Sequence, residues 1–151
     1  IRFFATFGGC GRFPVMPGTV GTLIAIPFAW MLSFAGAYGY MILVLLFAML
    51  AIFIAELYEN LSDVHDPKEV VVDEVAGFLV AMTWVPWSVS TVVFAFCLFR
   101  ILDILKPFPI GWLDRRVRGG SGVVADDLVA GVMTNVALHF FSATVGSSVG
   151  F

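Results

Sequence analysis

Long stretches without a charged residue dominate this sequence of 151 residues. Three of them, residues 13–55, 75–99 and 128–151, contain 43, 25 and 24 residues. A helix needs about 20 apolar residues to cross the roughly 30 Å of bilayer hydrocarbon. The pattern therefore predicts an all-α, polytopic integral membrane bundle, and we interpret residues 1–151 as one domain.

Breaks inside these stretches divide them into helices. A glycine-containing break at residues 36–39 splits the first stretch, and Trp84 and Trp87 flank Pro86 within the second, which is typical of a turn at a membrane interface. The third helix is short and is expected to cross incompletely or to re-enter. In total we predict five helices, over residues 19–34, 40–57, 70–83, 87–106 and 127–145.

The positions of lysine and arginine favour a turn at Pro86 over one long helix through it. A single crossing would divide the eight basic residues three to five between the two sides of the membrane. A turn instead places all eight basic and all eleven acidic residues on one side. Because cytoplasmic loops are rich in lysine and arginine, we predict that the charged face is cytoplasmic.

Composition supports the membrane class. Hydrophobic residues make up 60% of the chain and charged residues 13%, against roughly 45–50% and 25% in soluble domains. The formal net charge is only −3, and nothing in the sequence indicates a nucleic-acid partner. Cys10 and Cys97 form no CxxC motif, so we interpret them as small buried or lipid-facing residues.

Two acidic pairs, Asp73–Glu74 and Asp126–Asp127, are predicted at the cytoplasmic starts of the third and fifth helices. Each pair alone is typical of a helix N-terminus, where carboxylates complement the helix dipole. Four carboxylates entering a small bundle from one side would repel one another, and a hard cation removes that repulsion. We therefore predict Mg²⁺, which prefers oxygen ligands, bound by these four residues. Asp66, in the preceding loop, is a further candidate ligand.

Arg100, Asp103 and Lys106 share one face at the end of the fourth helix. Ionisable residues near the membrane boundary are costly and usually functional, although basic side chains that extend toward water are the plain alternative. On the functional interpretation, the arginine and the lysine bind phosphate oxygens beside the aspartate. Thr19 lies at the start of the first helix, where free backbone N–H groups favour anions, and a tight turn is an equal alternative there.

Three further features concern the last third of the chain. Residues 110–118 are predicted to form an amphipathic piece on the membrane surface, with Arg115 and its basic neighbours near anionic headgroups. The glycines at residues 119–122 predict a flexible connection into the second acidic pair. Asn135 and His139 are expected to form hydrogen bonds between helices.

Four motifs in this order span most of the chain. They are Pro17-Gly18-Thr19-x-Gly21-Thr22, Val72-Asp73-Glu74-x-x-Gly77, Phe99-Arg100-Ile101-Leu102-Asp103-x-x-Lys106-Pro107-x-Pro109-Ile110-x-Trp112-x-Asp114-Arg115 and Gly119-Gly120-x-Gly122-x-x-x-Asp126-Asp127-x-x-Ala130-Gly131. Together they resemble the bacterial phosphatidylglycerophosphatase A family over about residues 7–132. The third motif is long and specific, so the resemblance is strong.

The resemblance implies a Mg²⁺-dependent phosphatase of the bacterial cytoplasmic (inner) membrane. Its lipid substrate would be phosphatidylglycerophosphate, and its products phosphatidylglycerol and inorganic phosphate. On this interpretation the catalytic carboxylates are Asp73, Glu74, Asp103, Asp126 and Asp127. The residues expected to contact the substrate phosphate are Arg100, Lys106, Thr19 and Arg115.

The sequence contains no Cys-x5-Arg loop and no DxDx[TV] motif. We therefore expect a metal-activated water to attack phosphorus with one carboxylate as general base, and a covalent aspartyl-phosphate is the alternative. An enzyme like the CDP-alcohol phosphotransferases would need a DG-x2-AR-x8-G-x3-D-x3-D spacing, which is absent. A cation transporter would need polar groups at mid-membrane, whereas the acids here are predicted at one end.

Overall fold

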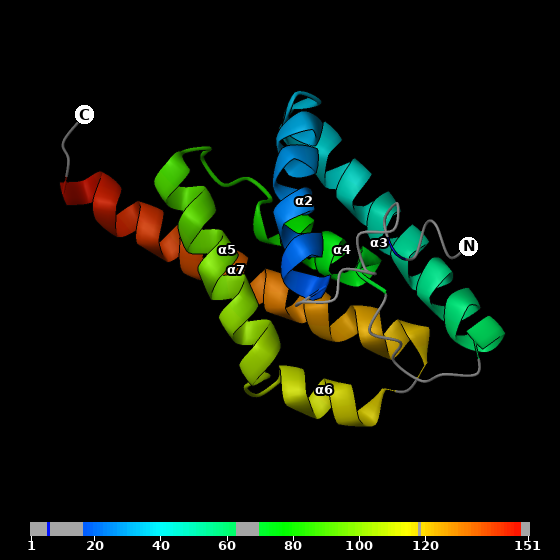
Figure 1. Cartoon of the computed structure of the whole chain (residues 1–151). Coiled ribbons are helices and arrows are strands. Elements are labelled where there is room, and N and C mark those ends of the chain that lie inside the picture. The colour runs from blue at the N-terminus through cyan, green and yellow to red at the C-terminus, as the bar shows by residue number, and fades with distance from the viewer. Residues whose placement is uncertain (1–5, 7–16, 63–69, 118, 149–151) are drawn as a thin grey trace.

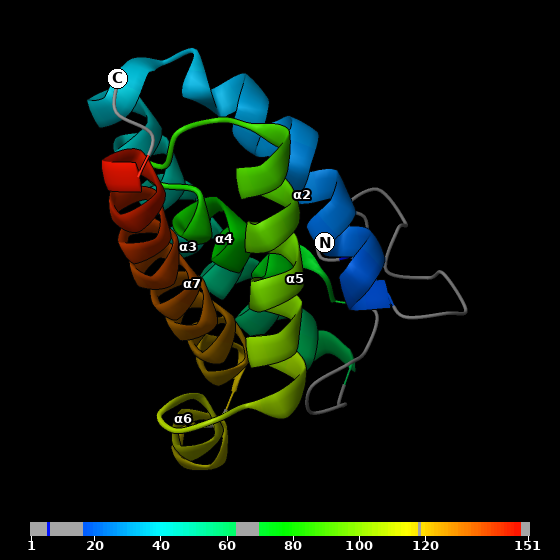
Figure 2. The same cartoon turned by 90° about the vertical axis from the view of Figure 1, so that its left-hand side faces the viewer.

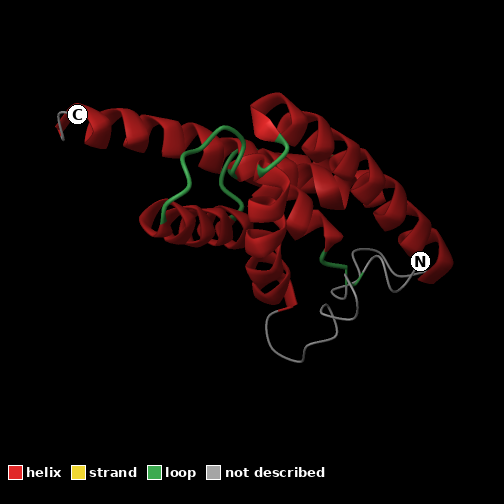
Figure 3. Cartoon of the chain, turned by 90° about the horizontal axis from the view of Figure 1, so that it is seen from above, coloured by secondary structure: helices red, strands yellow, loops and turns green. Residues whose placement is uncertain are grey.

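The computed structural model describes residue 6 and residues 17–62, 70–117 and 119–148. Within these ranges the chain forms helices and no strand (Figure 3), which confirms the all-α prediction. Cys10 and Asp66 lie outside the described residues. The helices are α2 (Pro17–Ser33), α3 (Gly36–Ser62), α4 (Val72–Ala81), α5 (Val89–Leu105), α6 (Ile110–Arg116) and α7 (Gly120–Ser148) (Figure 1).

Among the described residues, two helices are long and apolar enough to cross a membrane. The segment Gly36–Leu61 of α3 has a mean hydropathy of 2.6, and Gly120–Ala143 of α7 has a mean hydropathy of 1.3. Helix α2 is also apolar but has only 17 residues. Helix α4 has ten residues and spans about 15 Å, half of the hydrocarbon thickness. The prediction of a third helix too short to cross is therefore consistent with the structure.

The predicted turn around Pro86 is present, because α4 ends at Ala81 and α5 begins only at Val89. The indole Nε1 of Trp84 donates a hydrogen bond of 3.0 Å to the carbonyl oxygen of Ala37, which joins this turn to the first residues of α3. The uncharged turns α2–α3 and α4–α5 thus lie together, and α6 lies at the opposite end of the molecule (Figure 2).

Helix α4 lies inside the bundle and is largely enclosed by the other helices. Its side chains Phe78 and Leu79 are fully buried, and the ring of Phe78 meets that of Phe99 edge-on with centroids 6.1 Å apart. Asn135 of α7 donates from Nδ2 to the carbonyl oxygens of Ala81 and Thr83, at 3.0 and 2.8 Å. The predicted interhelical role of Asn135 is therefore confirmed, and these bonds satisfy the end of α4. The same prediction for His139 is wrong, because its Nδ1 bonds to the carbonyl oxygen of Asn135 within α7.

The structure corrects the predicted start of the last helix. Residues 120–122 are not a flexible connection, because α7 begins at Gly120, two turns before Asp127. A Cβ on Gly120 would lie 2.1 Å from the backbone nitrogen of Glu56, so the first turn of α7 packs directly against the backbone of α3. This tertiary contact stabilises a glycine-rich turn whose local helix propensity is poor.

Helix α3 also begins earlier than predicted. It starts at Gly36, with φ of 76°, and the break between α2 and α3 is limited to Phe34 and Ala35. The first residues of α3 are therefore helical although they include two glycines. Glycine tolerates the positive φ that the turn requires, so it marks the turn without ending the helix that follows.

Candidate active site

The acidic residues meet because α4 and α7 cross with their backbones in contact. A Cβ on Gly131 would lie 2.2 Å from the carbonyl oxygen of Gly77, and a Cβ on Gly77 would lie 2.5 Å from the carbonyl oxygen of Asp127. Only glycine permits so close an approach. Asp73 and Asp127 each lie four residues, about one turn, before the glycine of their own helix. The crossing therefore brings these two carboxylates together.

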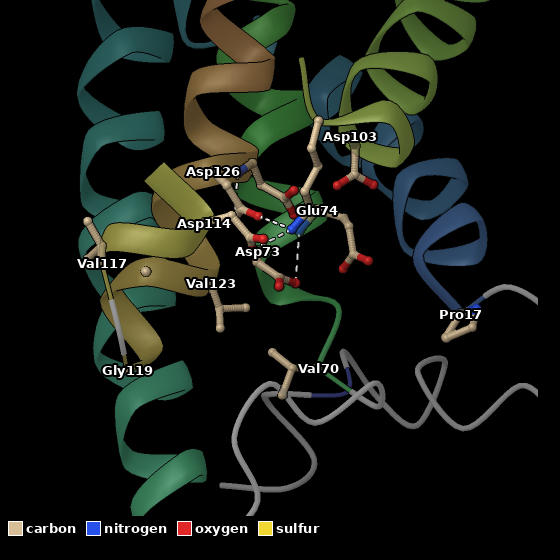
Figure 4. Close-up of a pocket in the computed structure, with 13 residues that line it drawn as sticks. Pro17, Val70, Asp73, Glu74, Asp103, Asp114, Val117, Gly119, Val123 and Asp126 are labelled. Atoms are coloured by element: carbon tan, nitrogen blue, oxygen red, sulfur yellow. Dashed lines mark hydrogen bonds and ion pairs between the residues drawn. The ribbon is translucent and has the colours of Figure 1, made fainter. Parts of the chain in front are cut away.

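The resulting group consists of Asp73, Glu74 and Asp127. Each offers a carboxylate oxygen, and these oxygens all lie within 4.8 Å of one another. Asp73 is 6% and Asp127 4% exposed. The group faces a cavity of about 450 Å³ that is also lined by Asp103, Asp114 and Asp126 (Figure 4). Three acidic side chains this close and this well buried need a proton or a cation between them.

Burial is the main electrostatic influence on the acids of α4. It raises the pKa of Asp73 well above its ordinary value, and the nearby charge of Glu74 raises it further. Burial also raises the pKa of Glu74, to about 8. The buried Oε2 atom of Glu74 has no hydrogen-bond partner among the described residues. These carboxylates could therefore hold a metal ion, which would favour their ionised forms.

Lys106 lies on the other side of the cavity, between two further carboxylates. Its Nζ atom donates to Asp126 Oδ2 at 2.5 Å and to Asp114 Oδ1 at 2.7 Å. Burial alone would lower the pKa of Lys106, but its hydrogen bonds and charge pairing with these two aspartates raise it. Its side chain nevertheless remains 31% exposed. Lys106 is thus a permanent cation at the cavity wall.

Arg100 and Asp103 form the third charged group, on α5. Their side chains pair through Nη1 and Oδ2 at 2.5 Å and are 13% and 15% exposed. The first turn of α2 packs closely over this group, since a Cβ on Gly18 would lie 2.2 Å from Glu74 Oε1 and 3.0 Å from Arg100 Nη1. The buried Nε of Arg100 has no hydrogen-bond partner among the described residues. One donor of this arginine is thus left for another acceptor.

The structure brings most of the predicted site residues to one cavity but not all of them. The five predicted catalytic carboxylates and Lys106 line it. Asp126 is apart from the group of three, because its carboxylate is engaged by Lys106. Three of the four predicted phosphate-binding residues, Thr19, Arg100 and Arg115, do not line the cavity. Thr19 lies in the first turn of α2, whose Pro17 does, Arg100 is paired with the lining residue Asp103, and Arg115 is exposed on α6.

Asp114 lines the cavity, although the sequence reasoning gave it no role beyond its place in a motif. It follows Lys106 by eight residues, and Pro107 and Pro109 interrupt any helical periodicity between them. The turn between α5 and α6 brings the two side chains together. Only the motif Asp114-Arg115 could have drawn attention to this aspartate.

Comparison with known proteins agrees with this arrangement. The family model described as phosphatidylglycerophosphatase A matches residues 3–142. The phosphatidylglycerophosphatase A of Escherichia coli strain K12 is 38% identical over 135 residues, covering 87% of this chain and 77% of that protein. The Haemophilus influenzae Rd protein of the same name is 33% identical over 134 residues, covering 87% and 82%.

A third relative has a different name. A putative phosphatidylinositol-3-phosphatase of Bacteroides thetaiotaomicron is 36% identical over 154 residues, covering 91% of both chains. No solved structure matches this chain. The family match extends over most of the chain, including all four motifs and every residue of the acidic group. The chain is therefore a phosphatase that belongs to the phosphatidylglycerophosphatase A family.

Proposed function

We propose that this protein hydrolyses phosphatidylglycerophosphate to phosphatidylglycerol and inorganic phosphate, with Mg²⁺ as cofactor. The observation that carries the proposal is one cavity in which three clustered carboxylates face a paired lysine. Asp73, Glu74 and Asp127 supply the acidic group, and Lys106 supplies the cation. Metal ligands and a fixed cation around one cavity are what transfer of a phosphoryl group requires.

Asp73, Glu74 and Asp127 would hold the Mg²⁺. Their donor set consists of carboxylate oxygens only, which suits a hard cation better than a softer transition metal. The unpartnered Oε2 of Glu74 leaves a ligand atom free at the site. When bound, the cation supplies positive charge to a phosphate that is otherwise too electron-rich to be attacked.

The remaining side chains bind the phosphate and handle protons. Lys106, at the cavity wall, would neutralise phosphate oxygens. Arg100 lies beside the cavity, paired with Asp103, and would add positive charge there. A water oxygen attacks phosphorus and passes its proton to a carboxylate, while the bond from phosphorus to the glycerol oxygen breaks and that oxygen gains a proton. Asp103 and Asp126 are the predicted catalytic carboxylates that form ion pairs, with Arg100 and Lys106 respectively, and we propose one of them as the base.

The long apolar helices support a location in the membrane. We propose a multi-pass protein of the bacterial inner membrane, with the cavity at the cytoplasmic headgroup level. Helices α3 and α7 are the candidate spans, and many of the exposed residues of α3 are large and apolar, among them Leu45, Met49 and Phe53. A lipid whose acyl chains stay in the bilayer can then present its phosphate to the cavity from the side.

A second substrate is favoured by a specific observation. The Bacteroides relative named as a putative phosphatidylinositol-3-phosphatase is about as similar to this chain as the two proteins named phosphatidylglycerophosphatase A. Both names describe an enzyme acting on a lipid with a phosphate monoester, so the same cavity residues suit the hydrolysis of either lipid. The headgroup beyond the phosphate must therefore decide between them.

The test is phosphate release from purified protein in mixed micelles. We expect phosphatidylglycerophosphate to be hydrolysed, EDTA to abolish release and Mg²⁺ to restore it. Phosphatidylinositol 3-phosphate and phosphatidic acid serve as competing substrates under the same conditions. Phosphate release that persists in EDTA would refute the requirement for Mg²⁺. A higher kcat/KM for the inositol lipid would refute phosphatidylglycerophosphate as the preferred substrate.

The orientation is tested in intact cells. In a variant with Cys10→Ser and Cys97→Ala, we introduce a single cysteine at Ala37 or at Arg116. A membrane-impermeant thiol reagent should modify position 37, at the uncharged end, and not position 116. The reverse pattern would refute a cytoplasmic cavity.

A further inference from the structure

Lys106 ends α5 in a backbone conformation that other contacts must stabilise. Its φ of 43° and ψ of 56° are left-handed, which costs energy for any residue with a Cβ atom. From this position the side chain of Lys106 donates to Asp114 of α6 and to Asp126 of α7. Its ammonium is thus held from two different helices.

Helix α6 approaches Lys106 through its backbone as well. A Cβ on Gly111 would lie 2.5 Å from the carbonyl oxygen of Lys106, so only glycine allows α6 to pack there. Asp114 follows Gly111 by three residues, nearly one turn. The close packing that glycine permits therefore brings the Asp114 carboxylate to the Lys106 ammonium.

Stability alone does not account for this pair. The Lys106 and Asp114 side chains are 31% and 42% exposed, and pairs with this much exposure contribute little to folding. Lysine has a long flexible stem, however, and a free ammonium would lose that freedom each time it bound a phosphate. Fixing the ammonium beforehand lowers that cost, which improves binding.

We propose that Asp114 is a positioning residue: together with Asp126 it holds the Lys106 ammonium at the cavity wall, where it receives the substrate phosphate. The proposal rests on the proposed function for the identity of the ligand. Asp114 itself need not touch the phosphate or the metal. Through Asp114, the position of α6 controls the position of the phosphate-binding cation.

Kinetics of three variants test the role. Asp114→Ala should raise KM for the lipid phosphate about tenfold and change kcat less than about twofold, because the phosphate charge is present before the reaction. Asp114→Glu should restore most of the loss. Glu56→Ala, which removes an exposed acid of α3 outside the cavity, is the matched control and should behave as wild type.

A double-mutant cycle separates positioning from an independent role. In a Lys106→Met background, Asp114→Ala should have an effect of less than about twofold, because the side chain it positions is gone. The Mg²⁺ concentration for half-maximal activity should be the same in Asp114→Ala and wild type. Independent, multiplying losses or a large fall in kcat at unchanged KM would overturn the proposal and make Asp114 a catalytic residue.

A second readout does not depend on activity. The chain has two lysines, Lys68 and Lys106, so acylation of each by an amine reagent can be followed by mass spectrometry of its peptide. Lys106 should react several-fold faster in Asp114→Ala than in wild type, with Lys68 as the internal reference. An unchanged ratio would overturn the positioning role even if the lipid phosphatase assay succeeds. A raised ratio with no lipid phosphate hydrolysis would refute the proposed function instead.

Discussion

The two acidic pairs look alike in the sequence but have different places in the fold. Asp73 and Glu74 lie in the first turn of α4, whereas Asp126 and Asp127 lie two turns into α7. Both residues of the first pair join the acidic group, but only Asp127 of the second pair does. The carboxylate of Asp126 is engaged by Lys106.

This difference shows that adjacent carboxylates can have different partners and different roles. The side chains of neighbouring helix residues point about 100° apart. Both can therefore take part in one site only where that site extends across both directions. At α4 both side chains belong to the acidic group, and the first turn of α2 packs over Glu74. At α7, Asp127 faces α4 and Asp126 faces the end of α5. We therefore expect the metal-binding role to be stronger for Asp127 than for Asp126.

The largest effect is expected for the members of the acidic group. Asp127→Asn or Asp73→Asn should lower kcat by about 10³-fold or more, because each removes a proposed ligand of a cation that supplies several kcal/mol to the transition state. The measurement is phosphate release at saturating Mg²⁺, with circular dichroism to show that helix content is retained. Activity near wild type in the double variant would exclude the group from catalysis.

Asp126→Asn tests whether Asp126 and Asp127 have different roles. We expect a loss of about 10- to 100-fold in kcat/KM, since one charged hydrogen-bond partner of Lys106 is removed. The Mg²⁺ requirement should stay close to that of wild type, unlike that of Asp127→Asn. Mg²⁺ titrations of the two variants, done side by side, measure this. Equal shifts in the Mg²⁺ requirement would mean that the pair acts as one metal-binding unit.

Gly131→Ala tests the crossing that brings the pairs together. The added methyl would lie 2.2 Å from the carbonyl oxygen of Gly77, and overpacking of this kind costs about 1–3 kcal/mol. We expect a lower melting temperature and reduced activity, because α4 and α7 must separate. Val132→Ala, which changes a half-exposed neighbour on α7, is the control and should alter neither. A stable, fully active Gly131→Ala variant would mean that the close crossing is not required.

The smallest effect is expected for the pH dependence of the free energy of unfolding without metal, and its sign can be predicted. Burial raises the pKa of Glu74 from 4.5 to about 8, so between these values the folded protein binds more protons than the unfolded chain. Stability in EDTA should therefore fall as pH rises through this window. Mg²⁺ binds the ionised group, and its stabilising effect should be larger at pH 8.5 than at pH 6. Thermal melts in detergent with EDTA or Mg²⁺ measure both effects.

Much of the fold could be predicted because hydropathy and charge are local properties. The uncharged stretches indicated the helices, and the tryptophans around Pro86 indicated the turn that the structure contains. The helix starts at Gly36 and Gly120 were missed, since glycines favour breaks locally. At Gly120 the start is fixed by packing against the α3 backbone, a contact between residues more than 60 positions apart in the chain.

Residue identity and spacing along the chain were sufficient to predict the helical class, the inventory of charged residues and the family. How the charged side chains pair with one another depends on the tertiary fold. In the fold, Asp127 lies with Asp73 and Glu74. Asp126 and Asp114 instead accept hydrogen bonds from Lys106, and Arg115 lies outside the cavity. The reason is that the partners of a side chain depend on where helices cross. Here glycines at positions 77, 111 and 131 set those approaches by allowing backbones to touch.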